Sequence, residues 1–379
     1  MSAAAPEAQF TRLEFRDPAR AQSLREALAK LCQEIGKEVS VMHVCGTHEQ
    51  SIAKFGLRSL LPKRLNVIMG PGCPVCVTDM PEVDEAVVLA KQGFVVATFG
   101  DMFRVPGSAK SLDEIKAEGA DVRLVTSPWE ALQLARHTDR EVIFFATGFE
   151  TTAVATAAVV LSNPPMNFSI LSAHKYIPPV MEIVAEMPQS KVQGFLAAGH
   201  AATITGWKIF ERFVERHGIP VVIGGFEPLD ILAALAELLK LIRNGERRVI
   251  NAYPRCVTPD GNRQAQKILW EVFQTEGGNW RGIAHVPNGN LRLRPRYASV
   301  DARRRFEIDL WSLSDQAPPK RSQECICGNI MAGISSPRDC RLFGNDCTPQ
   351  DPVGACMVSS EGTCKIWFEY GGHVVVSDG

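Results

Sequence analysis

The sequence has neither a long apolar run nor a strong excess of charge of either sign. Its 379 residues contain no uninterrupted apolar segment of about 18 residues, so we expect no membrane-spanning helix. The N-terminal stretch MSAAAPEAQFTRLEFRDPAR has mixed charges and lacks the apolar core of a secretory signal. The formal net charge of -1 argues against a protein built to bind nucleic acid or anionic lipid. We therefore expect a cytoplasmic protein without membrane or nucleic-acid partners.

Internal repeats and low-complexity tracts are also missing. The hydrophobic fraction of 45% and the charged fraction of 22% are ordinary for a folded soluble chain. The length suggests two or three domains and is sufficient for a sizeable core.

Short apolar runs alternate with turns and helical stretches along much of the chain. Eight β-rich runs are each followed by a glycine-rich or polar turn. They are residues 39–44, 64–70, 93–100, 121–127, 141–147, 168–173, 192–198 and 219–225. Such alternation predicts an α/β fold with parallel sheets covered on both faces. A single barrel is possible, but we favour two Rossmann-like three-layer lobes.

We predict four segments from these patterns. They are an N-terminal helical segment at 1–38, a first α/β lobe at 39–130, a second lobe at 131–245, and a smaller cysteine-rich iron–sulfur domain at 246–379. The alternation weakens after residue 245, where proline, glycine and arginine become frequent.

Cysteine is abundant for a chain expected in a reducing compartment. Static disulfides are rare there, so 11 cysteines indicate metal binding or redox chemistry. Six of them lie within residues 325–364, and Cys45, Cys73 and Cys76 lie near the N-terminus.

Thiols, imidazoles and carboxylates follow the predicted strands at equivalent positions. In parallel sheets, ligands bind beyond the carboxyl ends of the strands, where such turns meet. The residues are Cys45, Thr47, His48, Glu49, Cys73, Cys76, Asp101, Glu150, Thr151, Thr152, His174, His200 and Glu227. This placement predicts a polar cleft able to bind metal.

Each of these residues also has an ordinary structural explanation. Cys45 is either a small buried apolar residue or a soft ligand or nucleophile beside His48. His48 is a ligand, a proton carrier or a turn residue, and Glu49 fits the first turn of a helix. Glu150, Thr151, His200 and Glu227 are helix-start residues or cleft residues, and only the second role would bind a cofactor.

The CPVC motif leaves three possibilities for Cys73 and Cys76. The pair could be redox-active, bind zinc, or share an iron site with Cys45. The C-terminal spacing, C-x-C-x12-C-x6-C-x8-C-x7-C, is unlike a zinc ribbon and favours an iron–sulfur cluster over zinc or free thiols. Cys325 and Cys327 are too close in sequence for both to be assumed ligands.

Taken together, several motifs resemble the HypD family of [NiFe]-hydrogenase maturation factors. They are VCGTHE, GPGCPVC, TFGDMFRVPG, GFETT, GGFEPLD and CRLFGNDC…MVSSEGTC. The resemblance implies two α/β lobes, a [4Fe-4S] domain and a scaffold function with a small HypC-type partner. On that scaffold, Fe(II) receives two cyanides and one carbon monoxide before transfer to the hydrogenase large subunit. A HypE-type partner supplies cyanide.

The resemblance also implies roles for individual residues. Cys45 would be the iron ligand, and Cys73 and Cys76 would be the thiol–disulfide pair, sometimes counted with the iron site. The cluster ligands would be Cys327, Cys340, Cys347 and Cys364, with Cys325 and Cys356 as additional thiols. We predict catalytic roles for Cys73, Cys76 and His48, and cofactor contacts from Glu150, Thr151, His200 and Glu227.

Three functions compete at this point. The first is a scaffold for an Fe(CN)2CO group, without classical substrate turnover. The second is a cluster-dependent thiol–disulfide oxidoreductase, and the third is a binding module with a purely structural metal.

Overall fold

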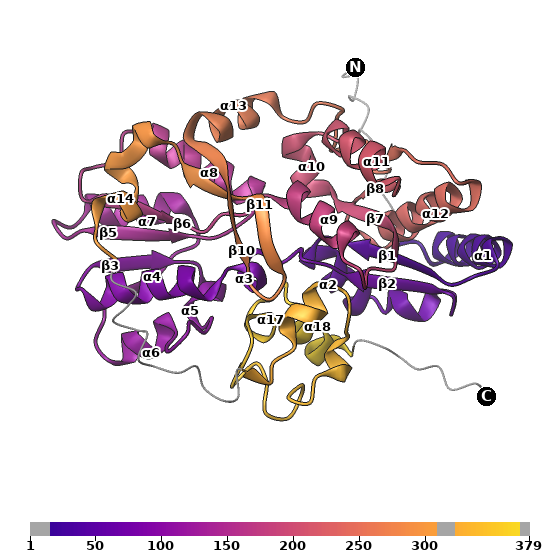
Figure 1. Ribbon diagram of the computed structural model, residues 1–379, viewed down its shortest axis with the longest axis horizontal. Helices are drawn as coiled ribbons and strands as arrows, with labels where there is room; N and C mark the ends of the chain where they lie inside the picture. Colours follow the sequence, from indigo (N-terminus) through magenta and orange to yellow (C-terminus); the bar gives the residue numbers. More distant parts are fainter. Residues whose placement is uncertain (1–15, 309–322, 372–379) are drawn as a thin grey trace, which may run out of the picture.

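The computed structural model describes residues 16–308 and 323–371. Within them, all eight predicted strands are present in two parallel sheets (Figure 1). Sheet A has the order β2-β1-β7-β8-β9 and sheet B the order β4-β3-β5-β6. The strands are β1 Val39–His43, β2 Leu65–Met69, β3 Val95–Thr98, β4 Val122–Leu124, β5 Val142–Ala146, β6 Phe168–Ser172, β7 Val192–Ala198, β8 Val221–Gly224 and β9 Val249–Asn251. The described strands therefore form two lobes and not one barrel.

The division of strands between the two sheets does not follow the predicted domain boundary near residue 130. The chain leaves sheet A after β2, builds all of sheet B from β3 to β6, and returns with β7. In sheet A, β1 pairs with β2 on one side and β7 on the other, and His43 lies opposite both Met69 and Leu196. The division into 39–130 and 131–245 is thus wrong for the sheets. Apolar runs of similar composition do not reveal which strands pair.

Helices cover both faces of the sheets, as the continuous apolar strands predicted. The longer ones are α1 Pro18–Ile35, α2 Gly46–Lys54, α4 Met80–Lys91, α7 Pro128–Arg136, α8 Glu150–Leu161, α9 Ile177–Glu186, α12 Pro228–Asn244, α13 Arg263–Val272 and α18 Thr363–Tyr370. The shorter ones are α3 Pro74–Val77, α5 Gly100–Phe103, α6 Leu112–Ala117, α10 Gly199–Thr205, α11 Glu211–His217, α14 Ala302–Arg305, α16 Cys327–Met331 and α17 Ala355–Val358. None of the helices in the described ranges has the length and apolar character needed to cross a bilayer.

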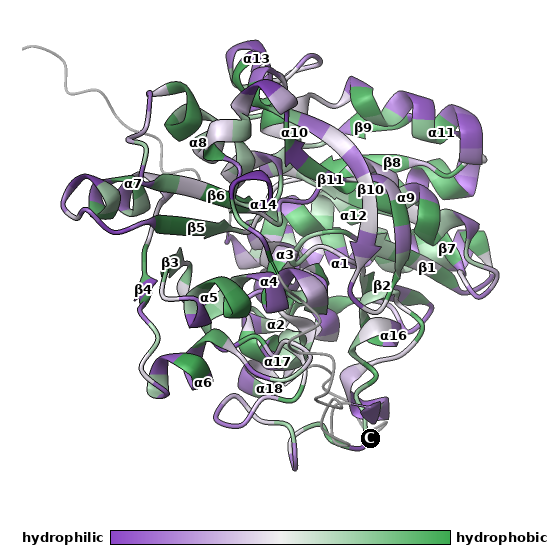
Figure 2. Ribbon diagram, turned by 60° about the vertical axis from the view of Figure 1, so that its left-hand side comes forward, coloured by the Kyte–Doolittle hydropathy of each residue, from purple (hydrophilic) through white to green (hydrophobic). Residues whose placement is uncertain are grey.

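The sheet strands form the core because their side chains are apolar on both faces. Every residue of β5 is buried, and Figure 2 shows this strand as hydrophobic, whereas outer helices such as α13 carry hydrophilic residues. Helices α1 and α12 pack against each other and against one face of sheet A, with Leu28, Leu235 and Leu239 fully enclosed. Asp17 begins α1 by accepting a hydrogen bond from the Ala19 amide.

The region from 246 to 308 does not belong to the cysteine-rich segment. Strand β9 extends sheet A, α13 packs on α8, and β10 Phe273–Trp280 and β11 Ala284–Leu293 form an antiparallel hairpin against the lobes. The described cysteine-rich segment is 323–371, which carries α16 to α18 and lies beside α2 and α3 (Figure 1). The rest of the predicted 246–379 domain, and residues 1–15 of the N-terminal segment, lie outside the described residues.

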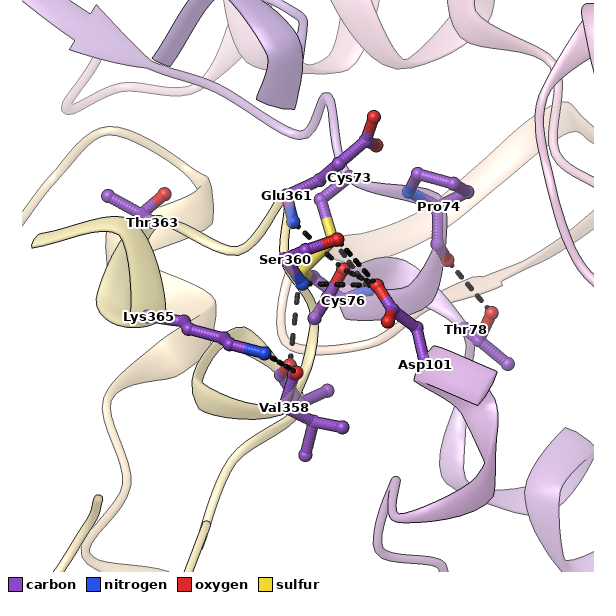
Figure 3. Close-up of a disulfide and its surroundings, with 12 residues drawn as sticks. Cys73, Pro74, Cys76, Thr78, Asp101, Val358, Ser360, Glu361, Thr363 and Lys365 are labelled. Carbon is purple, nitrogen blue, oxygen red and sulfur yellow. Dashed lines mark hydrogen bonds between the residues drawn. A yellow bond between two sulfur atoms is a disulfide. The ribbon is translucent and has the colours of Figure 1, made fainter. Parts of the chain in front are cut away.

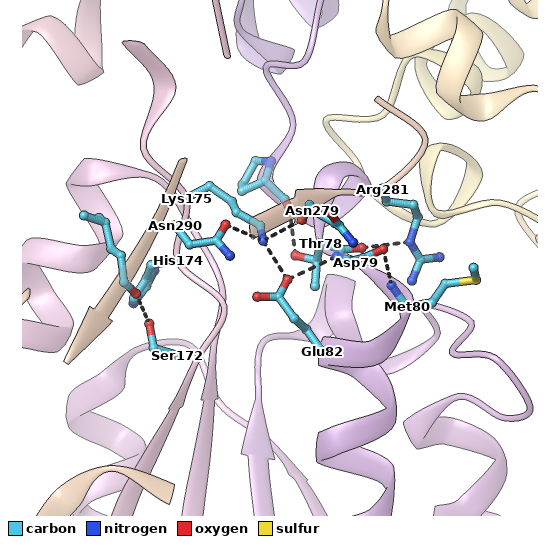
Figure 4. A network of polar contacts seen from close by, with 12 residues as sticks. Thr78, Asp79, Met80, Glu82, Ser172, His174, Lys175, Asn279, Arg281 and Asn290 are labelled. Atoms are coloured by element: carbon cyan, nitrogen blue, oxygen red, sulfur yellow. Dashed lines mark hydrogen bonds and ion pairs between the residues drawn. The ribbon is translucent and has the colours of Figure 1, made fainter. Parts of the chain in front are cut away.

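A buried ion pair joins the segment after β2 to the segment after β6 (Figure 4). The Lys175 ammonium lies 2.7 Å from a Glu82 carboxylate oxygen and 2.9 Å from the Asn290 side-chain oxygen. Arg292 donates to the other Glu82 oxygen at 2.9 Å. Burial opposes the Glu82 charge, but the charges of Lys175, Arg292 and Arg303 outweigh it and lower the pKa of Glu82 to about 2.

Glu82→Gln tests this ion pair. Its loss leaves the Lys175 ammonium buried without a carboxylate, so we expect the free energy of unfolding at pH 7 to fall by about 3 kcal/mol. Because the folded-state pKa lies below the ordinary value of 4.5, the Glu82 contribution is present above that value. This contribution is lost as the pH falls toward about 2. The difference in the free energy of unfolding between wild type and Glu82→Gln therefore becomes smaller on acidification.

Denaturant unfolding at several pH values measures both effects. Glu118→Gln is the control, since Glu118 pairs with Lys110 at the surface and its removal should leave stability unchanged. A Glu82→Gln protein as stable as Glu118→Gln would refute the expectation.

Candidate functional site

Cys45 lies at the centre of the site, two residues after the end of β1. It precedes the first residue of α2, and only 1% of it is exposed. Its Sγ atom lies 3.9 Å from His200 Nδ1, which comes from the first turn of α10 after β7. Burial, and secondarily the charge of Glu361, raises the pKa of the Cys45 thiol to about 12, although hydrogen bonds from His48 and Thr47 oppose this. In the metal-free protein this sulfur is therefore a neutral thiol.

The CPVC loop packs against the Cys45 backbone through a glycine. A Cβ atom at Gly72 would lie 2.0 Å from the Cys45 amide nitrogen, and the Gly46 amide donates to the Gly72 carbonyl at 3.1 Å. On the other side, a Cβ atom at Gly46 would lie 2.4 Å from Cβ of Glu361. These close approaches require glycine at both positions. They bring Cys45, the CPVC loop and the cysteine-rich segment together, although the positions after β1 and β2 predicted only the meeting of Cys45 with the CPVC loop.

Cys73 and Cys76 form a disulfide within the short helix α3 (Figure 3). Their Cα atoms are 5.3 Å apart, and each residue is 1% exposed. The Cys76 amide donates to Cys73 Sγ at 3.1 Å, and Pro74 occupies the first helical position. Cys76 Sγ lies 4.0 Å from the carbonyl oxygen of Ala355, the residue before Cys356. The disulfide therefore lies between the Cys45 site and the C-terminal cysteines.

The segment Ser359–Glu361 completes the site from the cysteine-rich side. Glu361 accepts a hydrogen bond from the Thr47 hydroxyl at 3.3 Å, and burial raises the pKa of its carboxyl group. Asp101, after β3, accepts from the Ser359 hydroxyl and from the Ser360 amide and hydroxyl, each at 3.0 Å. Sequence reasoning missed Glu361, because it follows no strand, although it stands within the quoted MVSSEGTC motif.

Glu150 lies buried near His200 at the start of α8. One carboxylate oxygen accepts the Ile177 amide at 2.9 Å, and the other has no partner among the described residues. Burial raises the pKa of Glu150 to about 7, while the amides of Glu150 and Ile177 and the His200 charge lower it. Burial also lowers the pKa of His200, whose ring lies 5.2 Å from that of Phe226. Both residues lie beyond the carboxyl ends of strands, as predicted: Glu150 follows β5 and His200 follows β7.

His48 and Glu49 take different positions on α2. His48 Nε2 donates to the Gly225 carbonyl at 2.9 Å, so the ring is fixed, while Nδ1 has no partner in the described residues. Burial lowers the pKa of His48 to about 3, so the ring is neutral. Glu49 is enclosed among His43, Arg58 and Trp367 and joins α2 to α18. Glu49 thus has a structural role, which was one of the alternatives considered from the sequence. It stabilises α2 through side-chain contacts as well as through its position in the first turn.

Six cysteines of the C-terminal segment line one small cavity. The lining is Cys325, Cys327, Ile330, Cys340, Phe343, Cys347, Gly354, Cys356, Met357 and Cys364. Within residues 16–308 and 323–371, no three His, Cys, Asp or Glu side chains are arranged around one metal ion. Ligands of a cubane bind four separate irons and lie farther apart than ligands of a single ion. The [4Fe-4S] cluster therefore remains a prediction, and the cavity includes Cys325 and Cys356 beside the four predicted ligands.

Comparison with known proteins identifies the family. A family model described as "HypD: Hydrogenase formation hypA family" matches residues 19–371. The chain belongs to the HypD family.

Curated relatives of the HypD family match nearly the whole chain. A putative hydrogenase expression/formation protein of Methanocaldococcus jannaschii is 44% identical, over 91% of this chain and 95% of its own. Hydrogenase maturation factors HypD of Azotobacter vinelandii and Cupriavidus necator are 41% and 39% identical, each over 94% of this chain and 96% of theirs.

The other two predicted cofactor contacts, Glu227 and Thr151, lie at the starts of α12 and α8, and their cofactor role remains a prediction. Glu227 precedes α12 at the surface, where its carboxylate lies 2.9 Å from the Arg16 guanidinium. Thr151 is half-buried in the first turn of α8. A strand-end position thus brings a side chain near the cleft, but the side chain's direction depends on neighbours that the sequence does not identify.

Gly72→Ala tests the contact between the CPVC loop and Cys45. The added methyl group has no room beside the Cys45 amide, so we expect a loss of about 3 kcal/mol in the free energy of unfolding. Gly100→Ala is the matched control, because a Cβ atom there meets nothing within 4 Å. Urea unfolding of both variants measures the difference, and equal stability would contradict the packing described.

Proposed function

We propose that this chain is a maturation scaffold on which the Fe(CN)2CO group of a [NiFe] hydrogenase is assembled. Its relatives are named hydrogenase maturation factors, and the enclosed Cys45 is the observation that carries the proposal. A buried thiol beside His200, with Glu361 of the cysteine-rich segment close enough for its charge to act on the thiol, suits a transient iron site.

The chemistry of the cargo fits this environment. Cyanide and carbon monoxide are strong-field ligands of low-spin Fe(II), for which a soft thiolate is a suitable protein ligand. Iron binding to Cys45 releases the thiol proton, since the thiolate is the metal ligand. Burial of Cys45 limits access of water and competing thiols to its sulfur. Glu150, with one buried oxygen unpaired, and His48 Nδ1 are further polar groups available to a bound ligand.

The Cys73–Cys76 disulfide is proposed to support this assembly by redox chemistry. Its reduction takes two electrons and two protons, breaks the S–S bond and yields two thiols. Exchange with a protein dithiol requires direct attack on a disulfide sulfur. With both residues 1% exposed, this closed form does not present a sulfur to such a partner. Burial therefore favours the scaffold over a thiol–disulfide oxidoreductase acting on protein substrates.

The cysteine cavity is proposed to hold a resident [4Fe-4S] cluster through Cys327, Cys340, Cys347 and Cys364. All four line one cavity, and the Val353 amide donates to Cys347 Sγ at 3.3 Å, which is typical support for a sulfur ligand. Such a cluster supplies one-electron transfer. The thiols reach their positions through α16, α18 and the loop between them, which pack on α2 and α3.

A scaffold of this kind works with other maturation proteins. We propose a HypC-type chaperone and a HypE-type cyanide donor as partners, with the hydrogenase large subunit served indirectly. The names of the relatives support hydrogenase maturation, and the individual partners rest on the family resemblance alone.

Infrared spectroscopy of anaerobically purified protein with its small partner tests the scaffold. We expect cyanide and carbon monoxide bands in wild type and their loss in Cys45→Ala, because the iron ligand is removed. Cys256→Ala is the control, since this thiol is exposed, whereas Cys45 is buried. Bands of full intensity in Cys45→Ala would refute iron binding by Cys45. Wild type without bands but with disulfide reductase turnover would favour the oxidoreductase.

Analysis of iron and acid-labile sulfide tests the cluster. We expect about four of each per chain in anaerobic wild type, and a large loss when any one of the four proposed ligands is replaced by alanine. Cys325→Ala and Cys356→Ala are the matched comparisons within the same cavity and should retain the cluster. Zinc without sulfide would instead indicate a structural metal.

A further inference from the structure

The turn of the β10–β11 hairpin lies between the CPVC helix and the first helix of the cysteine-rich segment. The Arg281 amide donates to the Val77 carbonyl at 3.0 Å, and Arg281 Nε donates to the Thr78 carbonyl at 2.8 Å. Its Nη2 atom donates to the Pro106 carbonyl at 2.9 Å. Figure 4 shows the guanidinium beside Thr78 and Asp79. Arg281 therefore binds the last residues of the helix that holds the disulfide.

The next residue of the turn contacts the cysteine-rich segment. A Cβ atom at Gly282 would lie 2.5 Å from the Gly328 Cα atom, and one at Gly328 would lie 2.3 Å from the Gly282 carbonyl oxygen. Gly282 also has a positive φ of 70°, which favours glycine. Gly328 directly follows Cys327 in α16. Consecutive hairpin residues thus link the disulfide helix to a proposed cluster ligand.

The Arg281 guanidinium is partly buried and forms no salt bridge in the described part of the chain. It donates to carbonyl oxygens, whereas nearby Arg292 and Arg303 pair with Glu82 and Glu85. Burial lowers the pKa of the Arg281 guanidinium, and the charges of Cys327, Asp79, Asp84 and Cys325 oppose this. A partly buried cation is stabilised by negative charge nearby. A cluster held by thiolates beside Arg281 would add to the negative charge that Asp79 and Asp84 already provide.

We propose that Arg281 is a positioning residue for the [4Fe-4S] cluster, and that its positive charge makes the cluster easier to reduce. The inference rests on the proposed cluster. Reduction adds one electron from an external one-electron reductant, and no bond in Arg281 forms or breaks. The added negative charge is stabilised by the guanidinium, so removing that charge favours the oxidised cluster.

Redox titration of reconstituted protein with dithionite, followed by electron paramagnetic resonance, tests this role. In Arg281→Met, we expect the ratio of reduced to oxidised cluster at the wild-type midpoint to fall about tenfold, equal to a shift of about 59 mV for one electron. Arg281→Lys keeps the charge and should remain within about threefold of wild type. Arg104→Met is the control, because Arg104 also donates to carbonyls of the cysteine-rich segment but is exposed beside Asp113. Its ratio should not change.

Each outcome decides the inference. Equal ratios in Arg281→Met and wild type overturn it, as does an equal shift in Arg281→Lys and Arg281→Met. Loss of the cluster from Arg281→Met but not from Arg281→Lys supports the role of the Arg281 charge. Loss from both variants shows that Arg281 is needed only for folding and overturns the inference. A wild type without any cluster signal refutes the proposed cluster itself, and a signal that Arg281→Met leaves unmoved refutes only the role of Arg281.

Discussion

The close approach of Gly72 to the Cys45 backbone is the contact on which the rest of the site depends. It places the loop after β2 directly against the end of β1, two strands that are neighbours in sheet A. Gly46 allows a close contact with Glu361 in the same way. Three chain segments that are distant in sequence therefore meet around the Cys45–Gly46 backbone.

This packing determines the chemistry available to Cys45. The enclosed thiol is neutral, the neighbouring imidazoles of His48 and His200 have lowered pKa values, and Glu150 has a raised one. Burial favours the uncharged form of each of these groups. The proposed Fe(II) cargo would be the strongest charge in such a site, so its binding would change the protonation of the surrounding groups more than binding at an exposed site would.

Local sequence patterns were enough to predict much of this fold. The apolar runs located all eight named strands, and the turns after them correctly located Cys45, the CPVC pair, Glu150 and His200. The sheet order could not be predicted, because β1 pairs with β7 across a separation of about 150 residues and nothing in either run specifies the other. Glu361 and Arg281 were missed for a related reason. Each acts through a contact that exists only after distant segments pack, and the ion pair between Glu227 and Arg16 is another such contact.

The insertion of sheet B within sheet A gives the disulfide a particular topological place. Cys73 and Cys76 lie on the covalent path that leaves sheet A for sheet B, and Lys175 lies on the path that returns. Glu82, six residues after Cys76, holds Lys175 through their buried ion pair. The ion pair therefore joins the segment that leaves sheet A to the segment that returns to it, close in sequence to the disulfide. A movement that separates these two segments would have to break the buried ion pair, and the CPVC loop lies only six residues before Glu82.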